Sequence, residues 1–280
     1  WSNVVLPLLH AFNNSVCEEP LNEEEVNTIF DGLARKESQQ FEQKKIAIDF
    51  CVTSSEEMYR KEIKEFPYLV SKLIPEGAIT AISAGTGAGK SLFLMIVLKY
   101  IAEGNYLFDQ EEFETKQTNI LVIDQEMDED LIIGRYKNII PEGVPIDFMY
   151  EQDWRIDQEE HLLWLEDLIK ENNYGLVVFD TLTTIHSSEE NDAGQMREIN
   201  KKLLRLIGNT GVTIIYLHHH RKAFGNEKTS NASARGSTEI MAKVASHLTI
   251  TSTRSNDEDG NTSTQMDIRQ EKARRPESIE

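Results

Sequence analysis

The sequence has few cysteines, no long apolar run and little positive charge. Its two cysteines, Cys17 and Cys51, lack the spacing of a metal site, so we expect reduced thiols, as in cytosolic proteins. No apolar run approaches the roughly 18 to 20 residues that span a bilayer. No basic start precedes an apolar stretch, so no secretory signal is recognisable. These absences predict a protein without a membrane span that acts in the cytoplasm, that of the host if it comes from a phage or plasmid.

The shortage of positive charge weighs against nucleic-acid binding. Lysine and arginine number 29 against 48 aspartate and glutamate residues, which gives a formal net charge of −19. A strongly acidic surface repels phosphates, so DNA binding requires lysines and arginines gathered in one place. The 280 residues suffice for one large domain with a small appendage. Because the sequence begins at Trp1 rather than Met, we expect a fragment of a longer chain.

The first forty residues have a helical pattern. Asn22 and Glu25 match the capping box that opens many helices. Apolar residues then recur at the spacing of one helix face, at Val26, Ile29, Phe30 and Leu33. The polar stretch from Lys36 to Lys45 has the composition of a linker. Ser55 then opens a short charged helix that we expect to end before Pro67.

From about Pro75 onward, short apolar runs rich in β-branched residues alternate with helical patterns. The expected strands are Ile79–Ser83, Ile120–Ile123, Leu176–Phe179, Val212–Leu217 and Ala245–Ile250, and the expected helices are Ser91–Ala102, Glu159–Glu171 and Gly194–Ile207. A hairpin is expected from Leu248–Thr253 and Thr264–Arg269. This alternation predicts an α/β fold, a mostly parallel sheet with helices on both faces. We expect a helical module at 1–40, a linker with a short helix at 41–68, and this α/β domain at 69–280.

The strongest motif is the run Ala84-Gly85-Thr86-Gly87-Ala88-Gly89-Lys90-Ser91, which lies between an expected strand and an expected helix, as a P-loop does. Glycines let backbone N–H groups turn inward around phosphate oxygens, and the start of the helix adds the positive end of its dipole. Lys90 should reach the β- and γ-phosphates of ATP, and the Ser91 hydroxyl should ligate Mg²⁺. Ala84 stands where the pattern has its first glycine. The alternative is a glycine-rich turn that binds nothing.

Two further apolar strands end in carboxylates. Asp180 follows Leu176–Phe179, and paired with a P-loop it is a candidate to hold Mg²⁺ through water, although it could simply cap the next turn. Asp124 and Glu126 follow the strand Ile120–Ile123. Hydrolysis needs a group that orients and deprotonates the attacking water. Glu126 is the preferred base, with Asp124 as the alternative base and a surface carboxylate as the non-functional alternative.

In this order, the P-loop strand, the Glu126 strand, the Asp180 strand and a strand ending in Leu217-His218-His219-His220 resemble the RecA-like superfamily. Within it, the chain is similar to hexameric replicative helicases, in particular RepA-like P-loop ATPases. The segment Arg235-Gly236-Ser237-Thr238-Glu239-Ile240 is similar to a stretch those proteins carry. The resemblance covers roughly Leu73 to Arg275. It implies a RecA-like core that hydrolyses ATP with Mg²⁺ at the subunit interfaces of a homo-oligomeric ring of six subunits.

The resemblance also implies roles in DNA movement. His218 would be the polar sensor that reports the γ-phosphate to a DNA-contacting loop. That loop would carry Arg221, Lys222, Lys228 and Arg235 and face single-stranded DNA in the channel of the ring, where an acidic outer surface does not interfere. A solvated surface loop is the alternative. A metal site in the histidine triplet is disfavoured, because adjacent residues of a strand point to opposite faces.

Two further features follow from the resemblance. Lys272, Arg274 and Arg275 stand where relatives place basic fingers that enter the neighbouring subunit's ATP site and stabilise charge on the γ-phosphate. The segment from Trp1 to Ser38 resembles the small helical module that follows the primase domain in phage and plasmid primase–helicases. If so, a primase domain belongs to the same parent chain. A plain helical cap would have the same pattern.

The function that these patterns predict is an ATP-dependent DNA helicase or translocase that acts in DNA replication. A regulatory or recombinase-like ATPase of the same fold would share every phosphate-binding residue and differ in the loop from Arg221 to Arg235. A small-molecule kinase also uses a P-loop, but it needs a lid, and no arginine-rich lid segment is present in the sequence.

Overall fold

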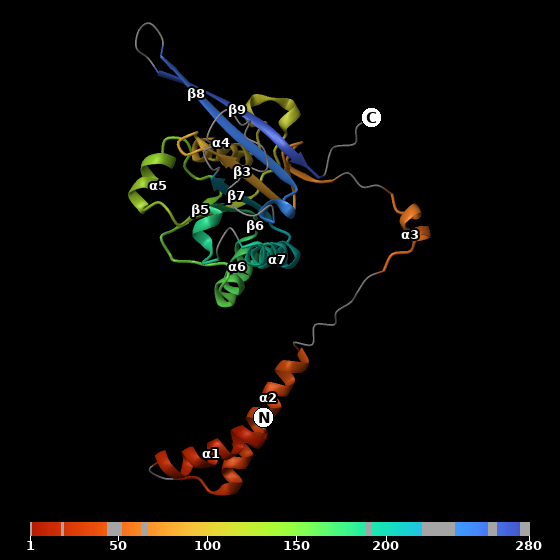
Figure 1. Ribbon diagram of the computed structural model, residues 1–280, viewed down its shortest axis with the longest axis vertical. Helices are drawn as coiled ribbons and strands as arrows, with labels where there is room; N and C mark the ends of the chain where they lie inside the picture. Colours follow the sequence, from red (N-terminus) through yellow and green to blue (C-terminus); the bar gives the residue numbers. More distant parts are fainter. Residues whose placement is uncertain are drawn as a thin grey trace. The chain divides into compact units, whose positions relative to one another are not determined.

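The computed structural model describes residues 2–17, 20–43, 52–62, 66–188, 192–219, 239–256 and 262–274 (Figure 1). The chain divides into two compact units, Trp1–Ile63 and Lys64–Glu280, and each is described by itself. Within the described ranges, every helix is too short or too polar to cross a bilayer.

The smaller unit is helical. Its helices are α1 (Ser2–Val16), α2 (Glu23–Gln43) and α3 (Ser55–Arg60). The capping box before α2 is confirmed: the Glu25 N–H donates to Asn22 Oδ1 at 3.0 Å, and the Asn22 N–H donates to Glu25 Oε2 at 3.0 Å. The prediction of a linker from residue 36 is wrong as far as Gln43, because α2 continues through that stretch. Its glutamine, glutamate and lysine residues are good helix formers, and it has neither glycine nor proline to end the helix.

The larger unit is built on a seven-stranded sheet with the order β5-β4-β6-β7-β3-β8-β9. Its strands are β3 (Ile79–Ala84), β4 (Asn119–Asp124), β5 (Ile146–Tyr150), β6 (Tyr174–Asp180), β7 (Thr213–His219), β8 (Ser246–Asn256) and β9 (Thr262–Ala273). All neighbours pair in parallel except β8 and β9, which form an antiparallel hairpin. The predicted parallel sheet and terminal hairpin are therefore confirmed. A separate antiparallel pair consists of β1 (Tyr68–Val70) and β2 (Ile74–Pro75).

Helices cover both faces of this sheet, as predicted (Figure 1). On one face α6 (Glu159–Asn172) and α7 (Ala193–Thr210) pack on a core that includes Leu165 and Leu203. On the other face α4 (Lys90–Glu103) packs on a second core. The remaining helix, α5 (Glu129–Tyr136), follows β4. Short 3₁₀ turns at Leu107–Asp109, Glu111–Phe113, Leu182–Ile185 and Ile240–Ala242 complete the described elements.

The sequence did not predict β5, which forms an edge of the sheet next to β4. Its five residues include Asp147 and follow Pro145, and their side chains are only partly buried. An edge strand lacks the continuous apolar run that identifies a buried parallel strand. The five predicted strands have that run, because they lie between two neighbours.

Candidate nucleotide site

The loop Gly85–Gly89 joins the end of β3 to the first residue of α4, which is Lys90. Gly87 and Gly89 have φ values of +76° and +90°, in the left-handed region that side chains with a Cβ rarely adopt. The departure at Ala84 falls on the last residue of the strand, whose methyl group is fully buried in the core. The strand–loop–helix context that the P-loop prediction requires is therefore present, with the N-terminus of α4 beside the loop.

Lys90 is buried beside two carboxylates. Its side chain belongs to the first turn of α4, and its exposed fraction is 7%. Burial lowers the pKa of the Lys90 amine, while the nearby carboxylates of Asp180 and Glu126 act in the opposite direction. An ammonium group held inside this edge of the sheet is suited to interact with the phosphates of a nucleotide.

Asp180 is the last residue of β6 and lies opposite Asp124 in the parallel register of β4 and β6. The Ser91 hydroxyl donates to Asp180 Oδ2 at 3.3 Å, so the two predicted magnesium ligands are neighbours. Burial first, and then the charges of Asp124 and Glu126, raise the pKa of Asp180 to about 7. Three carboxylates thus share one edge of the sheet with the amine of Lys90.

Glu126 lies two residues beyond the end of β4, and its side chain is exposed. Its Oε1 accepts a hydrogen bond from the Thr181 hydroxyl at 3.0 Å, which connects it to the residue after Asp180. Asp124 has no exposed surface, and its Oδ1 accepts the backbone N–H groups of Glu126 and Met127. The two carboxylates that the sequence could not separate as candidate bases therefore have different surroundings.

These residues fit MgATP by their chemistry. A hydroxyl and a carboxylate supply the oxygen ligands that Mg²⁺ prefers, and the glycine-rich loop at a helix N-terminus suits phosphates. Crowding of three carboxylates is the environment in which a divalent cation is most favourable. No three carboxylate, histidine or cysteine side chains converge as a metal cage in the part of the chain that the structure describes. Mg²⁺ does not need one, because it is usually held by one or two protein groups together with water and substrate phosphates.

His218 is the penultimate residue of β7, and its exposed fraction is 1%. It lies beside Ser83 of β3 in the register of the sheet. On the other side of β3, the His247 imidazole of β8 is fully buried and forms a hydrogen bond with the Ser83 hydroxyl at 3.0 Å. The strand that leads into the phosphate loop thus lies between two strands that carry buried histidines, and no pattern in the sequence singles out His247.

The basic residues predicted as fingers and as a DNA loop are only partly described. The Lys272 amine donates to the Met241 carbonyl at 2.5 Å, and burial, followed by the charge of Arg274, lowers its pKa. Arg274 has an exposed side chain, and its backbone N–H donates to the Ala245 carbonyl. The remaining predicted residues, Arg275, Arg221, Lys222, Lys228 and Arg235, lie outside the described residues.

Two contacts at the site join segments far apart in sequence. The Thr181 hydroxyl, which bonds Glu126, follows the predicted magnesium ligand directly and could have been proposed from that position. Met266 of β9 packs against the phosphate loop, since a Cβ placed on Gly89 would lie 2.9 Å from its Sδ. No sequence signal connects Met266 with Gly89, because the contact depends on how the hairpin lies against the sheet.

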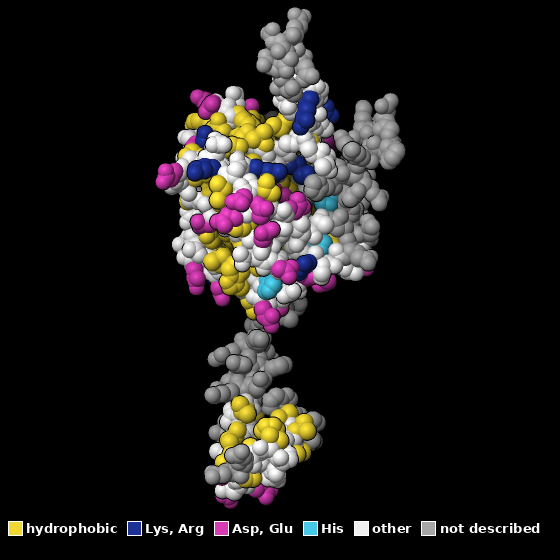
Figure 2. Space-filling view, turned by 90° about the vertical axis from the view of Figure 1, so that its left-hand side faces the viewer, with side chains coloured by type: hydrophobic (Ala, Val, Ile, Leu, Met, Phe, Trp, Pro, Cys, Tyr) yellow, Lys and Arg dark blue, Asp and Glu magenta, His cyan; other side chains and the backbone are white. Residues whose placement is uncertain are grey.

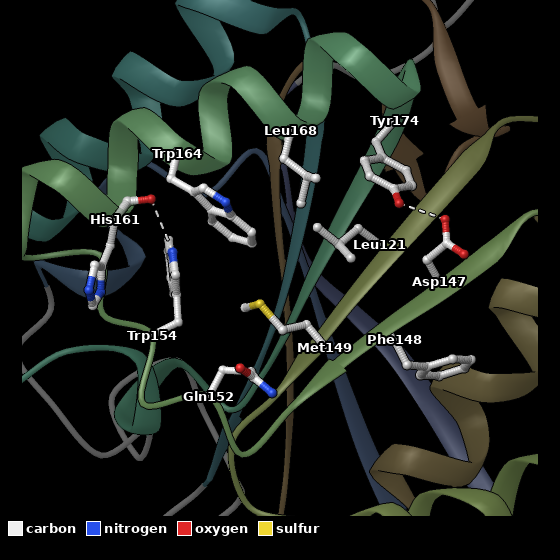
Figure 3. A pocket seen from close by; sticks show the side chains of 10 residues that line it. All are labelled: Leu121, Asp147, Phe148, Met149, Gln152, Trp154, His161, Trp164, Leu168 and Tyr174. Atoms are coloured by element: carbon white, nitrogen blue, oxygen red, sulfur yellow. Dashed lines mark hydrogen bonds between the residues drawn. The ribbon is translucent and has the colours of Figure 1, made fainter.

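A second cavity of about 470 Å³ lies beside β5 and α6 (Figure 3). Trp154, Trp164 and Met149 form much of its apolar wall. Within it the Trp154 Nε1–H donates to the His161 carbonyl at 3.1 Å, and the Tyr174 hydroxyl donates to Asp147 at 2.5 Å. None of the residues predicted to bind nucleotide lines this cavity, so it is separate from the phosphate loop.

Comparisons with known proteins agree with this geometry. The sequence pattern of the AAA domain family matches residues 49–225, more than half of the chain. No curated protein matches the chain. Among solved structures, the ATPase domain of a helicase has a similar fold, with a TM-score of 0.51 and 13% sequence identity. The match covers 72% of this chain and 79% of that one, and it confirms the predicted RecA-like α/β fold.

Proposed function

Because the chain belongs to the AAA domain family, we propose that it is an ATP-hydrolysing motor that acts on single-stranded DNA as a helicase or translocase in DNA replication. The observation that carries the proposal is the convergence of Lys90, Ser91, Glu126 and Asp180 where β3, β4 and β6 end. Ligands of open α/β sheets bind at this edge, beyond the carboxyl ends of the strands.

Each side chain has one role in the proposal. The backbone of Gly85–Gly89 surrounds the phosphates, and Lys90 stabilises negative charge on the β- and γ-phosphates. Ser91 and Asp180 hold Mg²⁺, which when bound neutralises charge on the transferred phosphoryl group. Glu126 orients the attacking water and takes its proton, with the Thr181 hydroxyl holding its carboxylate at 3.0 Å.

We further propose that a neighbouring subunit of a hexameric ring completes each site with an arginine. Among the described candidates, Lys272 already donates to the Met241 carbonyl within its own chain, whereas the Arg274 side chain is exposed. Arg274 is therefore the better candidate to reach a neighbouring site and stabilise charge on the γ-phosphate. The predicted sensor role of His218 and the DNA loop with Arg221, Lys222, Lys228 and Arg235 belong to the same proposal.

ATP hydrolysis measured with and without single-stranded DNA tests this function. We expect DNA to stimulate hydrolysis several-fold, and Lys90→Ala to abolish both rates. A variant with Arg221, Lys222, Lys228 and Arg235 replaced by glutamine should keep the basal rate and lose the stimulation. Hydrolysis that depends on Lys90 but ignores DNA would contradict the motor function and leave the ATPase.

That outcome would favour the second candidate, a regulatory or recombinase-like ATPase without unwinding activity. The net charge of −19 favours it, because an acidic surface opposes DNA binding. On the side of the larger unit drawn in Figure 2, acidic side chains gather near the middle, with a row of basic side chains just above them.

The smaller unit supports one further proposal about the parent protein. Its helices α1 and α2 agree with the helical pattern that resembles the module following primase domains. We propose that the chain is the motor part of a primase–helicase. Detection of a primase domain encoded upstream in the same reading frame would test it.

A further inference from the structure

The carboxylate of Asp124 organises the turn that carries Glu126. Its Oδ1 accepts the N–H of Glu126 at 2.8 Å and the N–H of Met127 at 3.0 Å. An aspartate that accepts the amides two and three residues ahead fixes the backbone between them, as in an Asx turn. The Gln125 N–H also donates to the Asp180 carbonyl at 3.3 Å, which ties the same turn to β6.

Burial distinguishes Asp124 from Glu126. Asp124 is fully buried at the end of β4, while the Glu126 carboxylate is exposed and bonded to the Thr181 hydroxyl. A general base must come within hydrogen-bond distance of the water that it activates. Glu126 meets this condition, whereas Asp124 has one oxygen engaged by two amides and the other enclosed in the protein.

The enclosed oxygen of Asp124 has a candidate partner in Tyr136. Tyr136 belongs to α5, is buried, and packs edge to face on Phe148 with ring centroids 4.9 Å apart. Burial, and then the charges of Asp180 and Asp124, raise the pKa of its hydroxyl, which places that hydroxyl near both carboxylates. Within the described residues, neither Asp124 Oδ2 nor the Tyr136 hydroxyl has a protein hydrogen-bond partner. Buried donors and acceptors of this kind are commonly joined by an ordered water.

We propose that Asp124 is a positioning residue for hydrolysis, which aims Glu126 at the attacking water, and that Tyr136 steadies the Asp124 carboxylate through one buried water. The inference rests on the proposed ATPase function with Glu126 as the base. Loss of the Asp124 carboxylate frees the turn, and Glu126 then spends less time in its working orientation. The phosphate loop belongs to other segments, so nucleotide binding is unaffected.

Kinetics of the full chain with four substitutions test the proposal. Asp124→Ala should lower kcat by roughly 30- to 100-fold and leave KM and the Kd of a fluorescent ATP analogue within about 3-fold. Asp124→Asn should keep kcat within about 5-fold, because the amide oxygen accepts the same two N–H groups. Tyr136→Phe should lower kcat about 3- to 10-fold and have no effect when added to Asp124→Ala.

The double variant with Asp124→Ala and Glu126→Ala distinguishes positioning from base catalysis. It should be no slower than Glu126→Ala alone, because a positioning residue has nothing left to position. The control is Asp128→Asn, which removes a carboxylate from the same loop and keeps the cap that accepts the Leu131 N–H at 2.8 Å. This control should change kcat by no more than about 2-fold.

Three outcomes overturn these ideas separately. If Asp124→Asn is as slow as Asp124→Ala while Glu126→Ala remains active, Asp124 is itself the base and the positioning role is wrong. If Asp124→Asn and Tyr136→Phe fold and Tyr136→Phe leaves kcat unchanged, the bridge to Tyr136 is wrong, even where Asp124→Ala fails to fold. If the wild-type chain shows no hydrolysis that depends on Lys90, the proposed function itself fails.

Discussion

The end of the sheet that carries the nucleotide site and the smaller helical unit differ in how much of their structure is buried. At the site, Asp124, Asp180 and Lys90 are buried among strands that are themselves covered on both faces. In the smaller unit only Val26, Phe30 and Asn13 are buried among the side chains that the structure describes. Several large apolar side chains there are exposed, including Leu8, Phe12, Val16, Ile29 and Leu33.

This difference shows two ways to hold a segment in place. The buried apolar core of the larger unit is extensive enough to hold three like charges beside one another, which is a cost in stability. The smaller unit has no such core among its described residues and depends more on local devices, such as the capping box at Asn22 and the bonds of Asn13 to the backbone of Leu21. A catalytic site requires the first kind of support.

The largest effect that would sharpen this comparison is expected from Asp180→Asn. The substitution removes one of three crowded carboxylates, so we expect the nucleotide-free protein to become more stable, with a higher Tm. It also removes a magnesium ligand, so hydrolysis should fall by roughly 100-fold or more. Thermal unfolding and ATPase assays check both.

The matched control for Asp180→Asn is Asp153→Asn, which removes an exposed carboxylate that is paired with Arg155. It should leave both Tm and hydrolysis nearly unchanged. A lower Tm in Asp180→Asn would contradict the view that the site holds its charges at a cost in stability.

The second effect compares the same substitution in the two regions. Leu203→Ala in α7 removes a side chain with no exposed surface, and it should lower the free energy of unfolding by about 2 to 5 kcal/mol. Leu8→Ala in α1 changes a side chain that is 63% exposed, and it should cost less than about 0.5 kcal/mol. Urea unfolding followed by circular dichroism measures both. A large loss in Leu8→Ala would show that its side chain is covered in solution.

Much of the larger unit could be predicted, because its signals are local. The P-loop needs only one strand, one loop and one helix in sequence, and the buried strands have continuous apolar runs. Contacts between distant segments could not be predicted. The bond from Lys272 to the Met241 carbonyl depends on how β9 returns along β8, and it is what separates Lys272 from Arg274 as a candidate finger.

The two carboxylates after β4 show where sequence reasoning ends. Asp124 and Glu126 follow the same strand two residues apart, so composition and spacing cannot tell which is the base. The register of β4 with β6 places Asp124 opposite Asp180, inside the sheet, and Glu126 beyond it. The partition between an aiming residue and a base is therefore a property of strand pairing and burial.

The smallest effect is expected at the start of α2, where the smaller unit depends on a local device. Asn22→Ala removes the side-chain acceptor of the Glu25 N–H, and we expect it to destabilise α2 by about 1 kcal/mol. The loss should appear as reduced helicity of the smaller unit in circular dichroism, with hydrolysis unchanged. Asn22→Ser keeps a side-chain oxygen at the cap and should retain most of the helicity. Equal losses in the two variants would mean that α2 is held by packing rather than by its cap, and the contrast between the two regions would then be wrong.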